Sequence, residues 1–155
     1  MLDLTKAKFT IRDAMRYDTP GDYYFKDGIW HFEAWLGLSR WEYRQEVFGH
    51  ELQEAMIITG AGITEEQIDT IDNFRQSIWS YARRYKRSAL ADPAEMELLA
   101  RLYEEIPQKL RDLYDQAHFQ AILWGRTFID ACGLNWADYE KEIIDSRGKI
   151  PVRGE

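Results

Sequence analysis

The chain contains 155 residues, of which 45% are hydrophobic, 14% aromatic and 30% charged, and its formal net charge is −7 at pH 7. This length suits one domain, and the composition excludes a disordered, collagen-like or plain coiled-coil protein. The negative charge argues against nucleic-acid binding, because the field of the protein would repel phosphates.

The first 36 residues carry the period-two alternation that is typical of β-strands. Residues 6–13 form one alternating segment, and residues 22–26 and 29–36 form two more. The last two flank Asp27-Gly28, a dipeptide that favours a tight hairpin turn. The sequence therefore predicts a small N-terminal antiparallel sheet or hairpin.

From Ser39 onward the apolar residues recur with the 3.6-residue period of helices. The expected helices cover residues 39–59, 64–87, 92–107, 107–132 and 135–145. We expect Ser39 and Glu42 to cap the first helix reciprocally, as a capping box, and Thr64 to cap the second. The predicted fold class is α+β, with the small sheet followed by a mainly helical bundle of four or five helices. Residues 1–145 should form a single domain, and residues 146–155 a frayed polar tail.

The first predicted helix contains the segment G-H-E-L-Q-E, which suggests metal chemistry. At about 100° per residue, His50 and Glu54 lie about 40° apart, so both can bind one divalent cation. Glu51 takes the position of the general base in the HExxH arrangement of zinc peptidases, and Glu54 replaces the second histidine. Two apolar stripes run along this helix: His50 and Glu54 lie within the second, beside Val47 and Ile58, whereas Glu46 lies on the narrow polar strip. This pattern predicts a helix that is covered on two sides.

Two more polar side chains lie on apolar faces of the predicted helices. Asp72 lies at the edge of the core face of the second helix, and His118 is flanked by isoleucines in the fourth. Together with His50 and Glu54 they form a four-ligand set of nitrogen and oxygen atoms that suits zinc, manganese or iron. The alternative is that each histidine is a hydrogen-bonded core residue, which is the commoner role of a lone histidine on an apolar face.

The remaining features concern partners and location. The basic run at residues 83–87 ends a predicted helix, where cations are favoured, so we interpret it as a solvated helix end. The spacing of Trp and Tyr residues indicates core packing or a contact between copies of the chain in a homo-oligomer. Residues 1–10 lack the apolar core of a secretory signal, and no apolar run reaches the roughly 18–20 residues that span a bilayer. We therefore expect a cytoplasmic protein without a membrane partner.

A succession of short motifs extends over most of the chain. The motifs are Thr19-Pro20-Gly21-Asp22, Trp30-His31-Phe32, Trp41-x-Tyr43, His50-Glu51-Leu52-x-Glu54-Ala55, Gly62-Ile63, Ile71-Asp72, Ala117-His118 and Gly133-Leu134-Asn135-Trp136-x-x-Tyr139. This succession resembles that of a family of uncharacterised phage and bacterial proteins with no established activity. The resemblance implies that His50, Glu51, Glu54, Asp72 and His118 are motif positions of such a family.

Three functions are compatible with these observations. In the first, the chain resembles a minimal zincin, a metal-dependent hydrolase in which His50 and Glu54 hold the metal, zinc by preference, and Glu51 activates a bound water. In the second, it resembles the MazG-type nucleotide pyrophosphohydrolases, with Glu51, Glu54, Glu66 and Asp69 holding magnesium. In the third, it is a non-enzymatic phage accessory protein whose buried polar cluster only fixes its packing. The sequence identifies no substrate.

Overall fold

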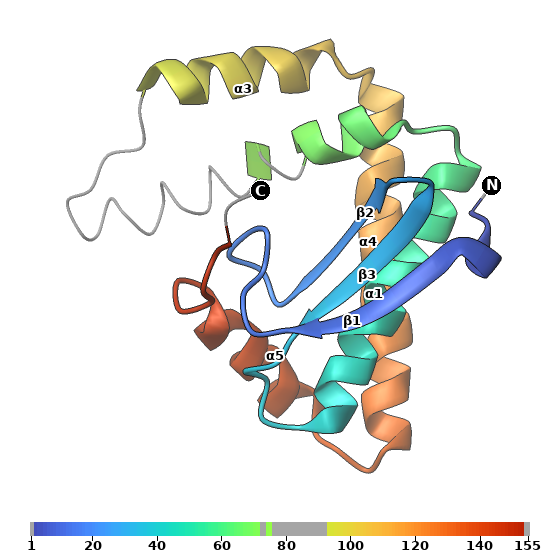
Figure 1. The fold of residues 1–155 in the computed structure, drawn as a ribbon, viewed down its shortest axis with the longest axis vertical. Coiled ribbons are helices and arrows are strands. Elements are labelled where there is room, and N and C mark those ends of the chain that lie inside the picture. Colours follow the sequence, from blue (N-terminus) through green and yellow to red (C-terminus); the bar gives the residue numbers. More distant parts are fainter. Residues whose placement is uncertain (1, 72–73, 76–92, 154–155) are drawn as a thin grey trace.

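The structure, a computed structural model, describes residues 2–71, 74–75 and 93–153. The strands are β1 (Ala7–Arg12), β2 (Gly21–Lys26) and β3 (Ile29–Trp35), preceded by a short 3-10 turn (Leu4–Lys6). The helices are α1 (Trp41–Gly60), α3 (Pro93–Glu105), α4 (Gln108–Ala131) and α5 (Trp136–Ser146), and residues 65–71 are also helical. A three-stranded N-terminal sheet is thus followed by helices (Figure 1), which confirms the predicted α+β fold class.

The hairpin between β2 and β3 forms as predicted, and the two strands pair in antiparallel orientation. Asp27 and Gly28 connect them with φ angles of 53° and 77°. Positive φ at both central residues is what a type I′ turn requires, and its twist matches that of the flanking strands. Local turn chemistry therefore explains this half of the sheet.

The third strand joins the sheet differently from our expectation. The strand order is β1-β3-β2, and β1 runs parallel to the central strand β3. The sheet is therefore mixed, and the expectation of a wholly antiparallel sheet is wrong for this pair. The physical reason is the connection at residues 13–20, which returns the chain past the end of β3 before β2 begins. Backbone bonds from Trp35 to Pro20 and from Leu36 to Arg12 fix that crossing at 2.8 and 2.6 Å.

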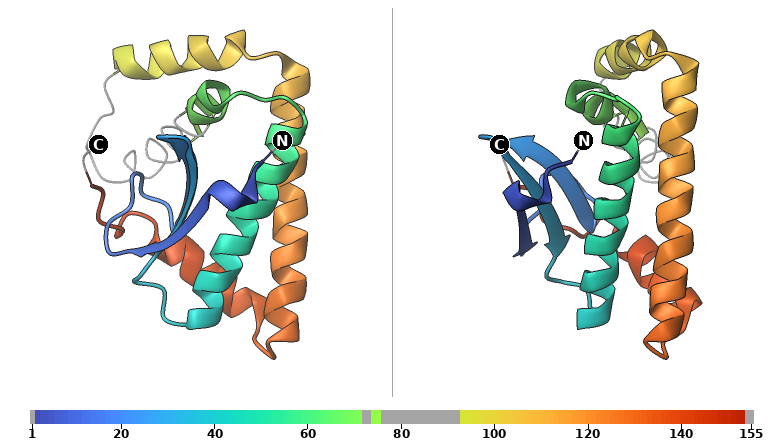
Figure 2. Two further views of the ribbon diagram at one scale, coloured as in Figure 1. Left: turned by 45° about the vertical axis from the view of Figure 1, so that its right-hand side comes forward. Right: turned by 90° about the vertical axis from the view of Figure 1, so that its right-hand side faces the viewer.

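Helix α1 is the central layer of the molecule. Figure 2 shows the sheet on one side of α1 and α4 on the other, with α5 below them. Apolar side chains fill both interfaces: Phe32 of the sheet belongs to the same buried cluster as Ala55 and Ile58 of α1 and Ala117 of α4. The helix is thus covered on two sides, as its two apolar stripes predicted.

Two glycines allow α1 and α4 to approach each other closely. A Cβ atom at Gly49 of α1 would overlap the ring of Trp124, and a Cβ atom at Gly125 of α4 would overlap the carboxyl group of Glu46. Each helix therefore has a gap in its side-chain surface that a group of the other helix fills. Close packing of this kind brings polar groups on the two facing helices within bonding distance.

The face of the sheet that points away from the helices carries a buried ion cluster. Glu33 of β3 is fully buried and accepts hydrogen bonds from Arg12 at 2.9 Å, Tyr24 at 3.0 Å and Arg153 at 2.6 Å. Arg153 belongs to the C-terminal segment, which also pairs with Met15 through backbone bonds of 2.8 and 2.9 Å. The docked segment differs from the frayed tail expected at residues 146–155, because a buried carboxylate provides a partner for its arginine.

Of the two predicted helix caps, one is confirmed and the other is wrong. Thr64 and Gln67 cap the helical residues 65–71 reciprocally, with bonds of 3.0 and 3.3 Å. By contrast, Ser39 donates from its backbone and its hydroxyl to Glu142 of α5, so the predicted capping box with Glu42 is wrong. Within the described part of the chain, no helix is both long enough and apolar enough to cross a bilayer.

Candidate metal centre

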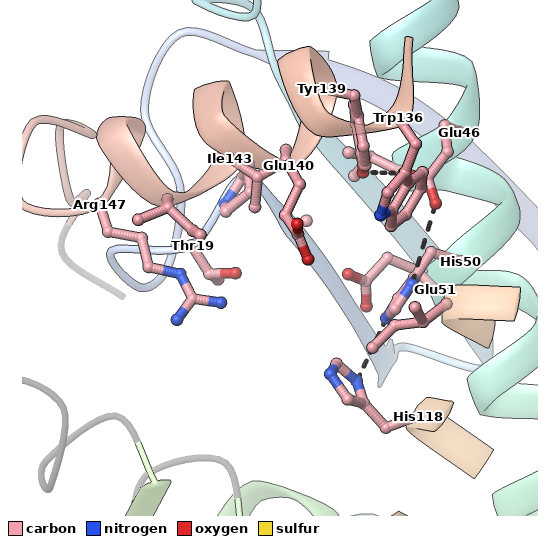
Figure 3. Close-up of a pocket in the computed structure, with 15 residues that line it drawn as sticks. Thr19, Glu46, His50, Glu51, His118, Trp136, Tyr139, Glu140, Ile143 and Arg147 are labelled. Carbon is pink, nitrogen blue, oxygen red and sulfur yellow. Dashed lines mark hydrogen bonds and ion pairs between the residues drawn. The ribbon is translucent and has the colours of Figure 1, made fainter. Parts of the chain in front are cut away.

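Three polar side chains meet between α1 and α4. His50 and Glu54 lie one turn apart on α1, and His118 reaches them from α4. Figure 3 shows the two imidazoles side by side. The distance from His118 Nδ1 to Glu54 Oε2 is 2.8 Å, that from His50 Nε2 to His118 Nδ1 is 3.2 Å, and that from His50 Nε2 to Glu54 Oε2 is 3.6 Å. The structure thus brings together three of the four side chains that the sequence nominated as ligands.

These distances are close to those expected of metal ligands. Atoms that lie about 2.1 Å from one tetrahedral zinc ion lie about 3.4 Å from one another. The three measured separations, 2.8 to 3.6 Å, fall on both sides of that value. A single ion could therefore be held with only small movements of the side chains. Among the described residues, these three form the group of histidines and acids whose ligand atoms all lie within 4.8 Å of one another.

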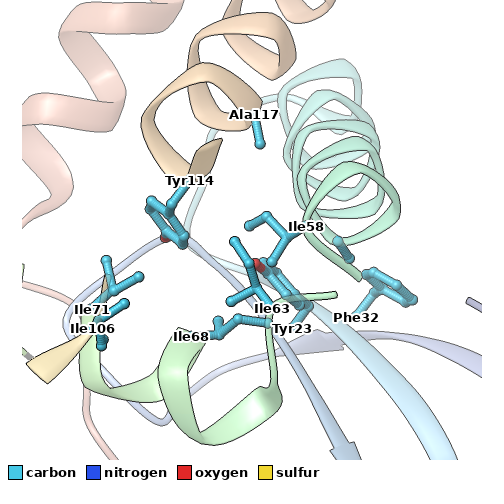
Figure 4. Close-up of a cluster of buried hydrophobic side chains, with 10 residues drawn as sticks. Tyr23, Phe32, Ile58, Ile63, Ile68, Ile71, Ile106, Tyr114 and Ala117 are labelled. Atoms are coloured by element: carbon cyan, nitrogen blue, oxygen red, sulfur yellow. The ribbon is translucent and has the colours of Figure 1, made fainter. Parts of the chain in front are cut away.

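Glu54 supplies the negative charge of the cluster. Glu54 is only 3% exposed, and its partner Tyr23 belongs to a buried apolar cluster that also includes Ile58 and Ala117 (Figure 4). Burial alone would raise the pKa of Glu54, but contacts with His118 and His50 outweigh it and lower this pKa to about 2. The Tyr23 hydroxyl, 3.2 Å away, donates to the second carboxylate oxygen. Glu54 therefore presents an ionised oxygen to the two imidazoles.

Glu46 lies on the other side of His50, one turn before it on α1. The sequence placed Glu46 on a polar strip of the helix, but the structure buries it completely, and burial raises its pKa to about 8. Tyr139 donates a hydrogen bond to Oε2 of Glu46. Oε1 has no hydrogen-bond partner among the described residues and lies 4.0 Å from Nδ1 of His50. The sequence feature that could have indicated a place for Glu46 beside the cluster is its position four residues before His50.

A pocket of about 200 Å³ opens beside the cluster. Its wall is formed by residues 19–21, α1, α4 and α5, and it includes both histidines of the cluster together with Glu51 (Figure 3). The absence of a side chain at Gly21 leaves room for the Glu51 carboxylate, which a Cβ atom there would overlap. Glu51, predicted as a general base, thus lines the same space as His50 and His118, two of the predicted ligands.

Glu66 and Asp69, the other nominated residues that the structure describes, do not join this cluster. Asp72 lies outside the described residues. Glu66 is exposed, and Asp69 lies 3.8 Å from Arg16, near the sheet. Sequence reasoning missed Tyr23 and Tyr139, the two hydroxyl donors to the buried acids, because nothing local marks a tyrosine on a strand or on another helix as a partner.

No protein-family model, curated protein or solved structure matches this chain. The function therefore has to be inferred from the centre itself. Its features are a triangle of two imidazoles and one ionised carboxylate, a pocket on one side, and three further carboxyl groups that line this pocket, those of Glu46, Glu51 and Glu140.

Proposed function

We propose that this protein binds a divalent metal ion through His50, Glu54 and His118. The observation that carries the proposal is the set of ligand-atom distances around the buried carboxylate, which suit one tetrahedral ion. Zinc is the preferred ion, because two imidazoles and one carboxylate are typical zinc ligands. Manganese and iron accept the same donors, whereas magnesium favours oxygen atoms alone.

We further propose that the bound metal supports hydrolysis. Structural zinc sites are closed by four protein ligands, whereas catalytic sites have three and leave one position open. The side chain of His118 is 45% exposed and lines the pocket beside the cluster, which would give a substrate access to the ion. A metal in such a site acts as a Lewis acid on a substrate and activates water. Glu51 lines the pocket and is the residue that we assign as general base.

Two other functions were compatible with the sequence. A MazG-type magnesium site would need Glu66 and Asp69 near Glu54, and no observation favours this, because Glu66 is exposed and Asp69 lies near Arg16. A non-enzymatic protein would use the cluster only as a hydrogen-bonded network that fixes the packing of α1 on α4. Metal content distinguishes the latter from our proposal.

The test is elemental analysis of protein that was purified without chelator, followed by calorimetric titration of the metal-free protein with zinc and with magnesium. We expect one zinc per chain and much weaker binding of magnesium. Zinc at about 100 times its dissociation constant should stabilise the fold by about 2.7 kcal/mol. His118→Ala should abolish this gain. His31→Gln, at the one histidine outside the cluster, should retain it.

A parent protein that binds no zinc and melts at the same temperature with and without zinc would contradict the proposal. The cluster would then be a packing device. Zinc binding that survives unchanged in His118→Ala would place the ion elsewhere and would equally contradict it.

A further inference from the structure

We infer that Glu46 and Tyr139 position the imidazole of His50, so that its Nε2 atom faces the metal ion. In this arrangement Glu46 accepts a hydrogen bond from Nδ1 of His50, and Tyr139 holds Glu46 in place. The inference rests on the proposed metal centre, but one of its tests does not require bound metal.

The first observation is an unsatisfied atom. Glu46 is fully buried, and its Oε1 atom has no hydrogen-bond partner among the described residues. Buried carboxyl oxygens normally accept hydrogen bonds, and an unsatisfied one requires an explanation. The ring nitrogen that faces this oxygen is Nδ1 of His50, at 4.0 Å. A small rotation of either side chain closes this gap.

The second observation is that Glu46 is held from behind. The Tyr139 hydroxyl donates to the other carboxyl oxygen, Oε2. Tyr139 of α5 is itself fixed, because its side chain is buried and its ring packs edge-on against that of Tyr43, with the ring centroids 5.1 Å apart. Asn135 caps the start of this helix by accepting from the backbone of Ala137 at 2.8 Å. The carboxyl group therefore has one anchored oxygen and one oxygen that points to His50.

The third observation is the space made for this carboxyl group. Gly125 of α4 faces Glu46, and any larger residue at that position would overlap Oε1. The gap in α4 is therefore filled by a polar group, although an apolar side chain would cost less to bury there. A buried carboxyl group at this position is explained if it binds and orients a neighbouring side chain.

The chemistry of imidazole indicates the role of the Glu46 carboxyl group. A histidine binds metal through a nitrogen lone pair, so the proton of neutral His50 must reside on the other nitrogen. When Nε2 binds the metal ion, that proton is on Nδ1 and needs an acceptor. An acceptor there fixes both the tautomer and the orientation of the ring, and removal of such a partner lowers metal affinity about 10–100-fold in known sites. Oε1 of Glu46 is in the right place to accept it.

The test uses a double variant, Glu46→Leu with Tyr139→Phe, which removes both polar groups and leaves neither unpaired. We expect its zinc affinity to fall about 10–100-fold. The metal-free double variant should nevertheless fold, with a cooperative thermal transition, because the carboxyl and hydroxyl groups are replaced together by apolar side chains. Glu42→Leu, the same substitution one turn earlier on α1, is the matched control and should retain the affinity of the parent. A double variant that binds zinc within about threefold of the parent overturns the inference, since the expected loss is at least tenfold.

Nuclear magnetic resonance of the ring nitrogens of His50 in metal-free protein at about pH 9, where the carboxyl group of Glu46 is ionised, gives the independent test. We expect the proton on Nδ1 in the parent and a shift toward the Nε2 form in the double variant. This result would support the positioning role even if the parent proved to bind no metal, in which case only the proposed function would fail. A parent in which the proton resides on Nε2 overturns the inference, whatever the metal content.

Discussion

The imidazole of His118 contacts the carboxylate of Glu54 across two helices, with Nδ1 2.8 Å from Oε2, although the residues are 64 positions apart. The contact exists because α1 and α4 approach each other closely where Gly49 and Gly125 lack side chains. Substitutions that separate the two helices should therefore disturb the metal centre as well as the packing.

Gly125→Ala is expected to destabilise the protein by about 1–3 kcal/mol, because the added methyl group would overlap the Glu46 carboxyl group in a filled interface. The loss of stability should lower the denaturant concentration at the midpoint of unfolding. The dependence of the unfolding free energy on denaturant concentration should stay unchanged. Zinc affinity should fall as well, because the displaced carboxyl group lies beside His50.

Gly60→Ala provides the matched control for this prediction. Gly60 is the last residue of α1, and a Cβ atom there would meet nothing within 4 Å. Alanine is a better helix former than glycine, so this variant should be as stable as the parent or more stable by up to about 1 kcal/mol. Equal losses in both variants would show that the contact between Gly125 and Glu46 is not the cause.

Glu51→Gln is expected to retain one zinc per chain but to lose hydrolytic activity. An amide cannot accept the proton that a general base removes, and such groups contribute about 10²–10⁴-fold to rates. Hydrolysis of an activated ester by zinc-loaded protein is the measurement. Glu140→Gln, which removes another carboxylate from the same pocket, is the control and should have a smaller effect. Similar activity in Glu51→Gln and the parent would leave the metal centre without the assigned base.

The main features of the fold could be predicted from local patterns. The change from period-two to helical periodicity near Ser39 separates the sheet from the helices, and the Asp27-Gly28 turn specifies the hairpin. The parallel pairing of β1 could not be predicted in this way. It depends on how residues 13–20 cross the end of β3, and no local signal encodes that path.

The candidate site, too, could be predicted only in part from local patterns. The positions of His50, Glu54 and His118 on apolar helix faces predicted that they point into the protein, and the structure places them together. The burial of Glu46 was not predicted, because it depends on Tyr139, which is 93 positions away, and on a glycine in α4. A helical wheel of α1 shows neither partner.

Arg153→Ala is expected to destabilise the protein by about 1–3 kcal/mol, because it removes one of the partners of the fully buried Glu33 and leaves a carboxylate oxygen without a hydrogen bond. Thermal denaturation should show a lower melting temperature than the parent. Lys141→Ala, which breaks an exposed ion pair with Asp145, should leave the melting temperature unchanged. A parent-like Arg153→Ala would indicate that the C-terminal segment contributes little to the fold.

The pH dependence of stability should report the buried carboxyl group of Glu46. Burial raises its pKa in the folded protein from the ordinary value of 4.5 to about 8. The folded state therefore holds this proton more tightly than the unfolded state does. The resulting contribution to stability is complete below about pH 4.5 and is lost as the pH rises through about 8.

The measurement is denaturant unfolding of metal-free protein at about pH 5 and about pH 9, on the two sides of this window. Other groups also titrate between these values, so the informative quantity is the difference between the parent and Glu46→Gln, whose amide stays neutral throughout. The parent should lose more unfolding free energy than Glu46→Gln as the pH rises, because only the parent must ionise a carboxyl group that is fully buried and has one oxygen without a hydrogen-bond partner among the described residues. Equal losses in the two proteins would mean that Glu46 ionises as readily in the folded state as in the unfolded chain, contrary to its burial between α1, α4 and Tyr139.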